Sequence, residues 1–350
     1  MKKKDYVPIP CPSHPTACVT QAIKAALDED AGNLGDVTTL ATVPPETQAT
    51  ATFLAKSDGV LAGLGVADEV LAIVDPTVEV EWRASDGDRV NSGQVLGLLR
   101  GSARSILVAE RIMLNFMQRM SGIATATAAM VSALDGLPTR VLETRKTAPG
   151  LRLLDKWAVL IGGGTNHRMG LYDMMMIKDN HIAAAGGIRA AIQRAEEYIR
   201  EKGLSGTITI EVETSTLQEV DEVVEILRGA RAAAEGSEAA AAEGQATEGP
   251  TTVSTAAPPS PSPSPLGKYV QRVMLDNMAK QDPSKDGGVD VSMLAEAVGR
   301  LGGLAETEAS GNVTLSSIRT IATTGVTFVS VGALTHSVAA MDISLKIKTQ

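Results

Sequence analysis

Three features of the 350-residue sequence predict an α/β fold. From Arg140 onward, short apolar runs alternate with stretches of helical periodicity, which is typical of parallel strands joined by helices. Each apolar run stops abruptly at charged, polar or glycine residues. Aromatic residues make up only 3% of the chain, whereas the small and aliphatic residues that pack closely between helices and a sheet are plentiful. Together these features favour helices packed on a parallel sheet.

The N-terminal third is predicted to combine helices and strands in a different order. Helical spacing of apolar residues predicts helices at 20–28, 66–74 and 105–122, and the last of these is expected to run further. Runs of strand-forming residues predict strands at 50–56 and 78–82, and turn residues followed by an apolar run predict a hairpin at 86–99.

The C-terminal part contains six apolar runs that predict strands. They lie at 141–144, 174–177, 208–212, 273–275, 306–309 and 328–331. Helices are predicted between most of them, as at 187–202, 216–228 and 290–301. Because α/β barrels carry their active sites at the carboxyl ends of the strands, the polar residues that end these runs favour a barrel. An open doubly wound sheet places its ligands at the same end of its strands and remains the alternative.

Residues 229–267 interrupt this alternation. They are rich first in Ala, Glu and Gly and then in Pro and Ser, so they offer little apolar surface to bury. They therefore predict a disordered insertion. At the C-terminus, residues 342–348 alternate between polar and apolar types and predict a strand that returns to the first domain.

The overall charge excludes some functions. The formal net charge is −9, from 32 basic and 41 acidic residues, which disfavours a general nucleic-acid binder. No uninterrupted apolar run is long enough to predict a membrane span. Cys11 and Cys18 flank His14, but no second pair of ligands accompanies them, so reduced thiols are favoured over a metal site.

The N-terminal segment does not predict a targeting sequence. Three lysines follow Met1, but no apolar stretch comes after them, and the segment is neither Arg-rich nor amphipathic. We therefore expect a soluble intracellular protein, in the cytoplasm or alternatively in a plastid or mitochondrion.

Five cations lie in or beside the predicted strand ends. They are Arg145, Lys146, His167, Arg168 and Lys178. Clustered cations are unfavourable unless an anion neutralises them, so the set predicts an anionic ligand. Arg suits bidentate binding of carboxylate or phosphate, and Lys acts as a point charge. Any one of them taken alone could instead be a surface charge paired with a nearby acid.

Two acids and two glycine-containing turns complete the set of candidates. Glu213 and Asp276 end two different runs and could bind Mg²⁺ or stabilise positive charge on a sugar carbon, although either could instead cap a helix. Ser310-Gly311-Asn312 precedes a stretch of helical spacing, and Gly332-Ala333 follows the last predicted strand; backbone N–H groups at such places can bind phosphate. Ordinary turn glycines are the alternative.

Seven sequence blocks, in this order, resemble the quinolinate phosphoribosyltransferase family. They are Glu143-Thr144-Arg145-Lys146-Thr147, Asn166-His167-Arg168, Ile177-Lys178-Asp179-Asn180-His181, Glu211-Val212-Glu213, Leu275-Asp276-Asn277, Glu308-Ala309-Ser310-Gly311-Asn312 and Gly332-Ala333-Leu334-Thr335-His336. The resemblance extends from about Leu27 to about Ile347, without the insertion. The amino-acid sequence around 157–172 and 306–312 is most similar to the plant and algal branch.

The resemblance implies a reaction and an architecture. The family joins quinolinate to 5-phosphoribosyl 1-diphosphate with Mg²⁺, releases pyrophosphate and CO₂, and gives nicotinate mononucleotide for NAD biosynthesis. It implies an N-terminal α/β sandwich domain at 1–121 and an open seven-stranded α/β barrel at 122–336, which carries the insertion. The C-terminal strand at 337–350 would return to the first domain. The resemblance also implies a homodimer or an assembly of dimers.

The resemblance assigns roles to the candidate residues. Arg145, His167, Arg168 and Lys178 would hold the two carboxylates of quinolinate, and Arg111 would come from the neighbouring subunit. The catalytic residues would be Lys146, Lys178, Glu213 and Asp276, the two acids serving as metal ligands. Further substrate contacts would come from Thr144, Ser310, Gly311, Asn312, Gly332 and Ala333.

Three other functions stay open at this point. A transferase acting on nicotinate would need fewer cations, because nicotinate has one carboxylate. A barrel enzyme could form a Schiff base through Lys178. A ligand-sensing or scaffold protein would be expected to have lost charged residues at the strand ends, and none is missing here.

Overall fold

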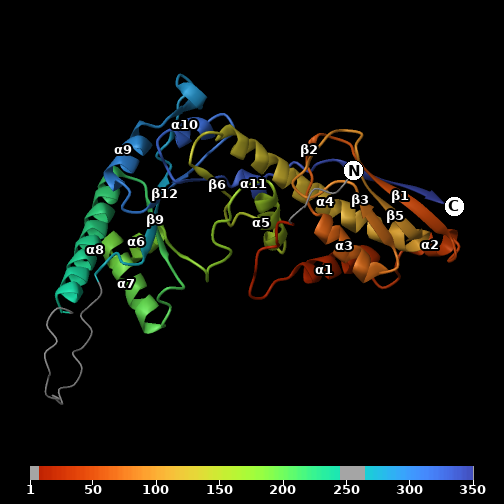
Figure 1. Ribbon diagram of the computed structural model, residues 1–350, viewed down its shortest axis with the longest axis horizontal. Coiled ribbons are helices and arrows are strands. Elements are labelled where there is room, and N and C mark those ends of the chain that lie inside the picture. Colours follow the sequence, from red (N-terminus) through yellow and green to blue (C-terminus); the bar gives the residue numbers. More distant parts are fainter. Residues whose placement is uncertain (1–7, 245–264, 350) are drawn as a thin grey trace, which may run out of the picture. The chain divides into compact units, whose positions relative to one another are not determined.

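The computed structural model describes residues 8–244 and 265–349. Within those residues the chain forms two compact units, shown with their elements in Figure 1. The first comprises Met1–Gly136, Arg140–Met169 and Val331–Gln350, and the second comprises Leu137–Thr139 and Gly170–Ser330.

The first unit is built on an antiparallel sheet of four strands. The strand order is β14 (Ile343–Thr349), β1 (Gln48–Ala55), β5 (Val95–Ser102) and β3 (Glu79–Trp82). Alternate residues of β1 are buried, because successive side chains of a strand point to opposite faces. The C-terminal strand pairs along the whole of β1, from Ala49 opposite Thr349 to Ala55 opposite Ile343.

Helices cover this sheet. The long helix α4 (Ala103–Ala133) buries an apolar face that includes Ile106, Met113 and Met120. Ser102 caps its first turn by accepting a hydrogen bond from the Ser105 amide. The other helices and short strands of the unit are α1 (Val19–Ala31), α2 (Val37–Thr42), β2 (Gly59–Val60), α3 (Leu64–Val74), β4 (Arg89–Val90), β6 (Arg140–Leu142), α5 (Arg152–Ile161) and α11 (Ala333–His336).

Asp86 lies at the start of α3. Its Oδ1 accepts a hydrogen bond from the Leu64 amide at 3.0 Å. Burial raises the pKa of Asp86 to about 6, although hydrogen bonds from the first amides of the helix act in the opposite direction. The folded protein therefore binds the Asp86 proton more tightly than the unfolded chain does.

We expect the Asp86→Asn variant to gain stability relative to the unmodified protein as the pH rises from about 4 to about 7. A group with a raised folded-state pKa loses its stabilising contribution as the pH rises through that pKa, and Asn does not titrate. The difference in unfolding free energy should change by up to about 3 kcal/mol over this window. Urea unfolding of both proteins at several pH values measures it. A difference that does not vary with pH would contradict the expectation.

The second unit contains parallel strands. In order across the sheet they are β13 (Phe328–Ser330), β12 (Glu306–Ser310), β9 (Val270–Asp276), β8 (Ile210–Thr214) and β7 (Met175–Ile177). Its other elements are α6 (Asp179–Ala185), α7 (Ile188–Glu201), α8 (Leu217–Gly244), β10 (Lys280–Gln281), the 3₁₀ turn η1 (Asp286–Gly288), β11 (Val289–Asp290), α9 (Ser292–Leu301) and α10 (Ile318–Ala322).

The predicted α/β class is confirmed. All six apolar runs of the C-terminal part contain strands, five in this unit and β6 in the first. The resemblance implied a seventh barrel strand. Beyond the six strands, the described residues of the first unit form one isolated parallel bridge, between Thr165 and Leu142.

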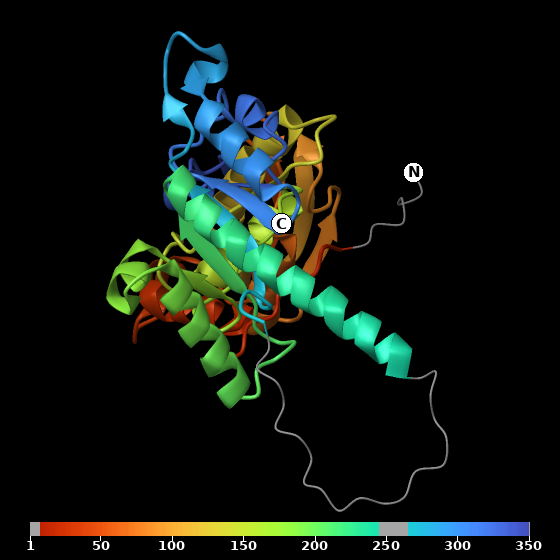
Figure 2. The ribbon, with the colours of Figure 1, turned by 90° about the vertical axis from the view of Figure 1, so that its left-hand side faces the viewer.

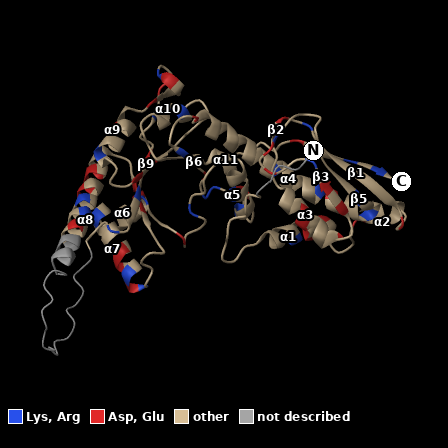
Figure 3. Ribbon diagram, in the orientation of Figure 1, with Lys and Arg blue, Asp and Glu red and all other residues tan. Residues whose placement is uncertain are grey.

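The predicted disordered insertion is wrong for residues 229–244. These residues continue α8 as one helix (Figure 2). Ala, Glu and Arg have high helix propensity, and Arg231 pairs with Glu235 one turn later at 3.0 Å. Lys, Arg, Asp and Glu residues are spread along α7 and the coloured part of α8 (Figure 3). The Pro/Ser-rich part of the predicted insertion at 245–264 lies outside the described residues.

The chain returns from the insertion beside α8. A Cβ atom on Gly267 would lie 2.9 Å from Ile226 Cγ2 and 3.4 Å from Ala230 Cβ. The buried Glu196 carboxylate accepts hydrogen bonds from the Gly267 and Tyr269 amides at 3.0 and 3.1 Å. Residues 230 and 267, near the two ends of the predicted insertion, are therefore close in space. Within the described residues, no helix combines the length and apolar character that crossing a bilayer requires.

Candidate active site

Four predicted site residues lie at the carboxyl edge of the parallel sheet in the second unit. Lys178 directly follows β7, Glu213 is the last residue but one of β8, Asp276 ends β9 and Ser310 ends β12. The register places Ser310 beside Asp276, and Glu213 beside Met274 of the neighbouring strand. Strands that run parallel bring their carboxyl ends to one edge, so these four residues lie along the same edge of the sheet.

Lys178 and Glu213 form an ion pair across two neighbouring strand ends. Glu213 is buried, whereas 42% of the Lys178 side chain is exposed. Lys178 is also the residue before α6, and its amide donates to His181 Nδ1 at 3.0 Å. The backbone of Lys178 is therefore fixed while its ammonium group remains accessible to an anionic ligand.

Asp276 and the Ser310–Asn312 turn are connected through Asn277. The Asn277 side-chain amide donates to Asp276 Oδ2 at 2.6 Å, and its backbone amide donates to the Ser310 carbonyl at 2.8 Å. Asn277 and Asn312 both have positive φ values, of 52° and 49°. Gly311 has φ 109°, and a Cβ atom there would lie only 2.2 Å from Asn277 Oδ1. Gly311 is thus required by the close approach of two strand-end loops.

The expectation that Ser310-Gly311-Asn312 opens a helix is wrong. The next helix, α10, begins at Ile318, and a hydrogen-bonded turn at Thr314–Ser317 separates it from Asn312. Helical spacing of Leu315, Ile318 and Ile321 suggested a longer helix. However, the Thr314 and Ser317 side chains accept hydrogen bonds from each other's backbone amides, as in a capping box, so the chain enters the helix only after Thr314.

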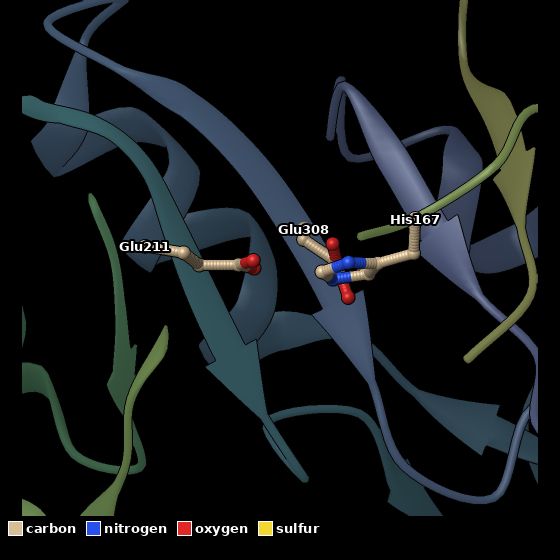
Figure 4. A group of neighbouring side chains, drawn as sticks. All are labelled: His167, Glu211 and Glu308. Atoms are coloured by element: carbon tan, nitrogen blue, oxygen red, sulfur yellow. The ribbon is translucent and has the colours of Figure 1, made fainter. Parts of the chain in front are cut away.

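Two buried carboxylates in the same sheet were not singled out by the sequence. Glu211 and Glu308, of β8 and β12, are both fully buried, with carboxylate oxygens within 4.8 Å of each other (Figure 4). Arg272 of the intervening strand β9 bonds Glu308 at 3.1 Å and packs over the Phe328 ring. The available signal was the E-x-E spacing in two strands, since i and i+2 share a face.

In the first unit, a buried polar network joins the residues that follow β6 to the segment at 165–168. Glu143 and Lys156 form an ion pair with both side chains fully buried. Glu143 also accepts hydrogen bonds from the Asn166 side chain and the His167 amide, each at 3.0 Å. Lys156 Nζ donates to the His167 carbonyl at 3.0 Å. The network therefore ties the backbone that carries Arg145 to the backbone that carries His167 and Arg168.

The side chain of Arg145 indicates an anionic ligand. Arg145 is half-buried, and its Nε is enclosed without a hydrogen-bond partner in the part of the chain that the structure describes. Its carbonyl accepts a hydrogen bond from Arg152 Nη2 at 3.5 Å. A buried cationic donor is unfavourable without an acceptor, and a bound carboxylate would supply one.

Lys146 and the Gly332–Ala333 turn also come together in the first unit. A Cβ atom on Gly332 would lie 3.3 Å from Lys146 Cδ, so the lysine stem packs against the glycine. The Lys146 amide donates to Thr144 Oγ1 at 3.1 Å. Gly332 directly precedes the short helix α11, which begins at Ala333.

Arg111 stands apart from these groups. It is exposed on α4, next to Glu110, whose pKa is raised by burial and lowered by the Arg111 charge. The contacts found among residues 8–244 and 265–349 do not join Arg111 to another candidate residue. The resemblance assigns it to the site of a neighbouring subunit, which agrees with its exposure.

Comparison with known proteins gives a consistent result. Residues 36–121 match the N-terminal domain of quinolinate phosphoribosyl transferase, and residues 123–243 and 260–346 match its C-terminal domain. The chain is 52% identical over 339 residues to the chloroplastic nicotinate-nucleotide pyrophosphorylase (carboxylating) of Arabidopsis thaliana. It is 50% identical, over the same length, to mitochondrial quinolinate phosphoribosyltransferase (decarboxylating) 2b of Nicotiana tabacum. Each alignment covers 97% of this chain and 85% of the relative.

A solved structure agrees with the sequence relatives. NadC from Streptococcus pyogenes superposes with a TM-score of 0.75 at 33% identity, covering 95% of this chain and 97% of NadC. The resemblance that the seven sequence blocks indicated is therefore confirmed over nearly the whole chain.

Proposed function

Because the chain belongs to the quinolinate phosphoribosyltransferase family, we propose that it transfers phosphoribose from 5-phosphoribosyl 1-diphosphate to quinolinate with loss of CO₂. The product would be nicotinate mononucleotide, which feeds NAD biosynthesis. The observation that carries the proposal is the convergence of Lys178, Glu213, Asp276 and Ser310 at the carboxyl edge of one parallel sheet.

The first unit supplies cations for the substrate carboxylates. Arg145, His167 and Arg168 lie on two segments that the Glu143–Lys156 network holds together. The resemblance assigns Lys178 to the same carboxylates. Fixed donors bind a dicarboxylate without having to reorganise, and they orient its ring nitrogen toward the sugar carbon. A monocarboxylate such as nicotinate would leave part of this set unused, so quinolinate is the better substrate.

Glu213 and Asp276 suit a magnesium ion that arrives with the diphosphate. They are carboxylates at the ends of adjacent strands, and Mg²⁺ is commonly held by one or two carboxylates together with substrate phosphates. Neither belongs to a group of three ligating side chains among the described residues, so substrate oxygens would have to complete the coordination. When bound, the metal would neutralise charge that develops on the leaving diphosphate.

No covalent nucleophile is needed in this mechanism. As the bond to diphosphate breaks, the sugar carbon gains positive charge, which the Glu213 and Asp276 carboxylates can stabilise. The resemblance assigns both Lys178 and Lys146 to the anionic donor. Once the ring nitrogen is ribosylated, its positive charge stabilises the electron pair left on the adjacent ring carbon when the carboxylate departs as CO₂, and a proton from water then bonds to that carbon.

We further propose a homodimer or an assembly of dimers, in which the exposed Arg111 completes the site of a second copy. Sedimentation of the purified chain would test this, and a monomer with full activity would refute it.

The compartment is a separate proposal. The two relatives quoted above are named chloroplastic and mitochondrial, which favours an organelle over the cytoplasm. Cell fractionation would distinguish these compartments.

A coupled assay tests the proposed reaction. Purified protein is incubated with quinolinate, 5-phosphoribosyl 1-diphosphate and Mg²⁺, and nicotinate mononucleotide and CO₂ are measured together. We expect the two products in equal amounts, little product from nicotinate, and loss of activity with a chelator. Product from nicotinate without CO₂ would overturn the assignment of the substrate.

We expect Arg168→Ala to weaken quinolinate binding by about 10- to 100-fold, because a charged hydrogen bond to a carboxylate is lost. Calorimetric titration with quinolinate measures the effect. The control is Arg83→Ala, which removes an exposed arginine of the same unit that pairs only loosely with Glu81 at 3.8 Å. Quinolinate affinity close to that of the unmodified protein would sink the assignment of Arg168.

A further inference from the structure

A continuous chain of hydrogen bonds fastens the backbone around Lys146 at two points. The Lys146 carbonyl accepts from Thr335 Oγ1 at 2.9 Å, and the Thr335 carbonyl accepts from Arg119 Nη2 at 3.2 Å. Arg119 makes two bonds of 2.8 Å to the Asp155 carboxylate. Asp155 Oδ2 also accepts from the Ala148 amide at 3.1 Å. The chain thus leaves the backbone at Lys146 and rejoins it at Ala148.

These residues come from four separate parts of the first unit. Arg119 lies in α4, Asp155 in α5, Thr335 in α11 and Lys146 in the segment after β6. Asp155 is fully buried and Thr335 is 1% exposed. Burying a charged pair costs desolvation energy, and a bidentate pair with further bonds to the backbone fixes geometry in return.

The same chain of bonds fixes the Gly332–Ala333 turn. The Thr335 and His336 amides both donate to the Gly332 carbonyl at 3.1 Å, so holding Thr335 also holds the turn. The Lys146 stem packs against Gly332. Movement of Thr335 would therefore shift the lysine and the turn relative to each other.

We propose that Arg119, Asp155 and Thr335 form a clamp that positions Lys146 and the Gly332–Ala333 turn to bind the phosphoribosyl donor together. The inference rests on the proposed function, which gives Lys146 and this turn to the donor. The clamp residues act through the backbone of Lys146 and are positioning residues. Arg145, one residue earlier, has its own tie through Arg152, so quinolinate binding does not depend on the clamp.

The test removes the Thr335 hydroxyl with little change of volume. We expect Thr335→Val to raise the KM for 5-phosphoribosyl 1-diphosphate by about fivefold or more, because one buried hydrogen bond is lost, while the KM for quinolinate stays within about twofold. Thr335→Ser keeps the hydroxyl and should restore the donor KM. The matched control is Thr127→Val in α4, where a fully buried threonine donates to the Ile123 carbonyl of its own helix at 2.8 Å.

The outcomes separate the clamp from the reaction. Equal effects of Thr335→Val on both KM values, failure of Thr335→Ser to restore the donor KM, or an equal shift in Thr127→Val would each overturn the clamp. Direct titration of the donor accompanies the kinetics. If the unmodified protein binds the donor but gives no product, the proposed reaction fails, and the ratio of donor affinities between the threonine variants still decides the clamp.

Discussion

Replacing Lys178 with Met should lower kcat/KM by about 1,000-fold, the largest loss of activity that we expect from a single substitution. Loss of one preorganised charge-stabilising donor typically costs 100- to 1,000-fold, and the resemblance assigns Lys178 to both substrates. The structure adds a second reason: without Lys178, the buried Glu213 carboxylate loses its ion-pair partner. Steady-state kinetics with each substrate varied in turn measures the effect.

A double-mutant cycle separates the two reasons. If Lys178 and Glu213 act as one unit, Glu213→Gln combined with Lys178→Met should lose little more activity than Lys178→Met alone. The control is Lys202→Met, which removes an exposed lysine at the end of α7 in the same unit. A decrease of less than about tenfold for Lys178→Met would show that Lys178 does not serve catalysis as proposed.

The strand ends could be predicted because their physical signal is local. A buried parallel strand needs consecutive apolar residues, so the runs before Lys178 and Asp276 were visible in the sequence. The polar residues that interrupt such runs fall at the edge where parallel strands end. This places Lys178, Glu213, Asp276 and Ser310 correctly without knowledge of their distances.

The residues that hold the site in place could not be predicted in the same way. Lys156 lies three residues from both Leu153 and Val159 on the buried face of α5, where an apolar residue is the normal expectation. Its partner Glu143 is 13 residues away, and Asp155 is 36 residues from Arg119. Pairing at such separations depends on tertiary packing, which leaves no periodic trace in the sequence.

The course of α8 shows the opposite limit. Composition alone predicted disorder from residue 229, because the segment has few large apolar residues. The helix nevertheless continues to Gly244, since Ala and Glu favour helical backbone even where little surface is buried. Low hydrophobicity therefore did not identify the local structure of the first part of the predicted insertion.

Lys156→Met should cause the largest loss of stability, about 3–5 kcal/mol of unfolding free energy, because it leaves the Glu143 carboxylate buried without its cation. Urea unfolding at neutral pH measures the loss. Exposed Lys24 of α1 provides the control, since Lys24→Met should change stability by no more than about 0.5 kcal/mol.

Neutralising Glu143 as well tests whether its buried charge causes the loss of stability. Glu143→Gln added to Lys156→Met should recover at least about 1 kcal/mol, because no uncompensated charge remains and the Gln oxygen can still accept from the His167 amide. Quinolinate affinity should stay reduced in the double variant, because the tie from Lys156 to the His167 carbonyl is still missing. Recovery of stability without recovery of affinity would separate the two roles of the pair. If the double variant is less stable than Lys156→Met alone, the buried charge is not what destabilises the single variant.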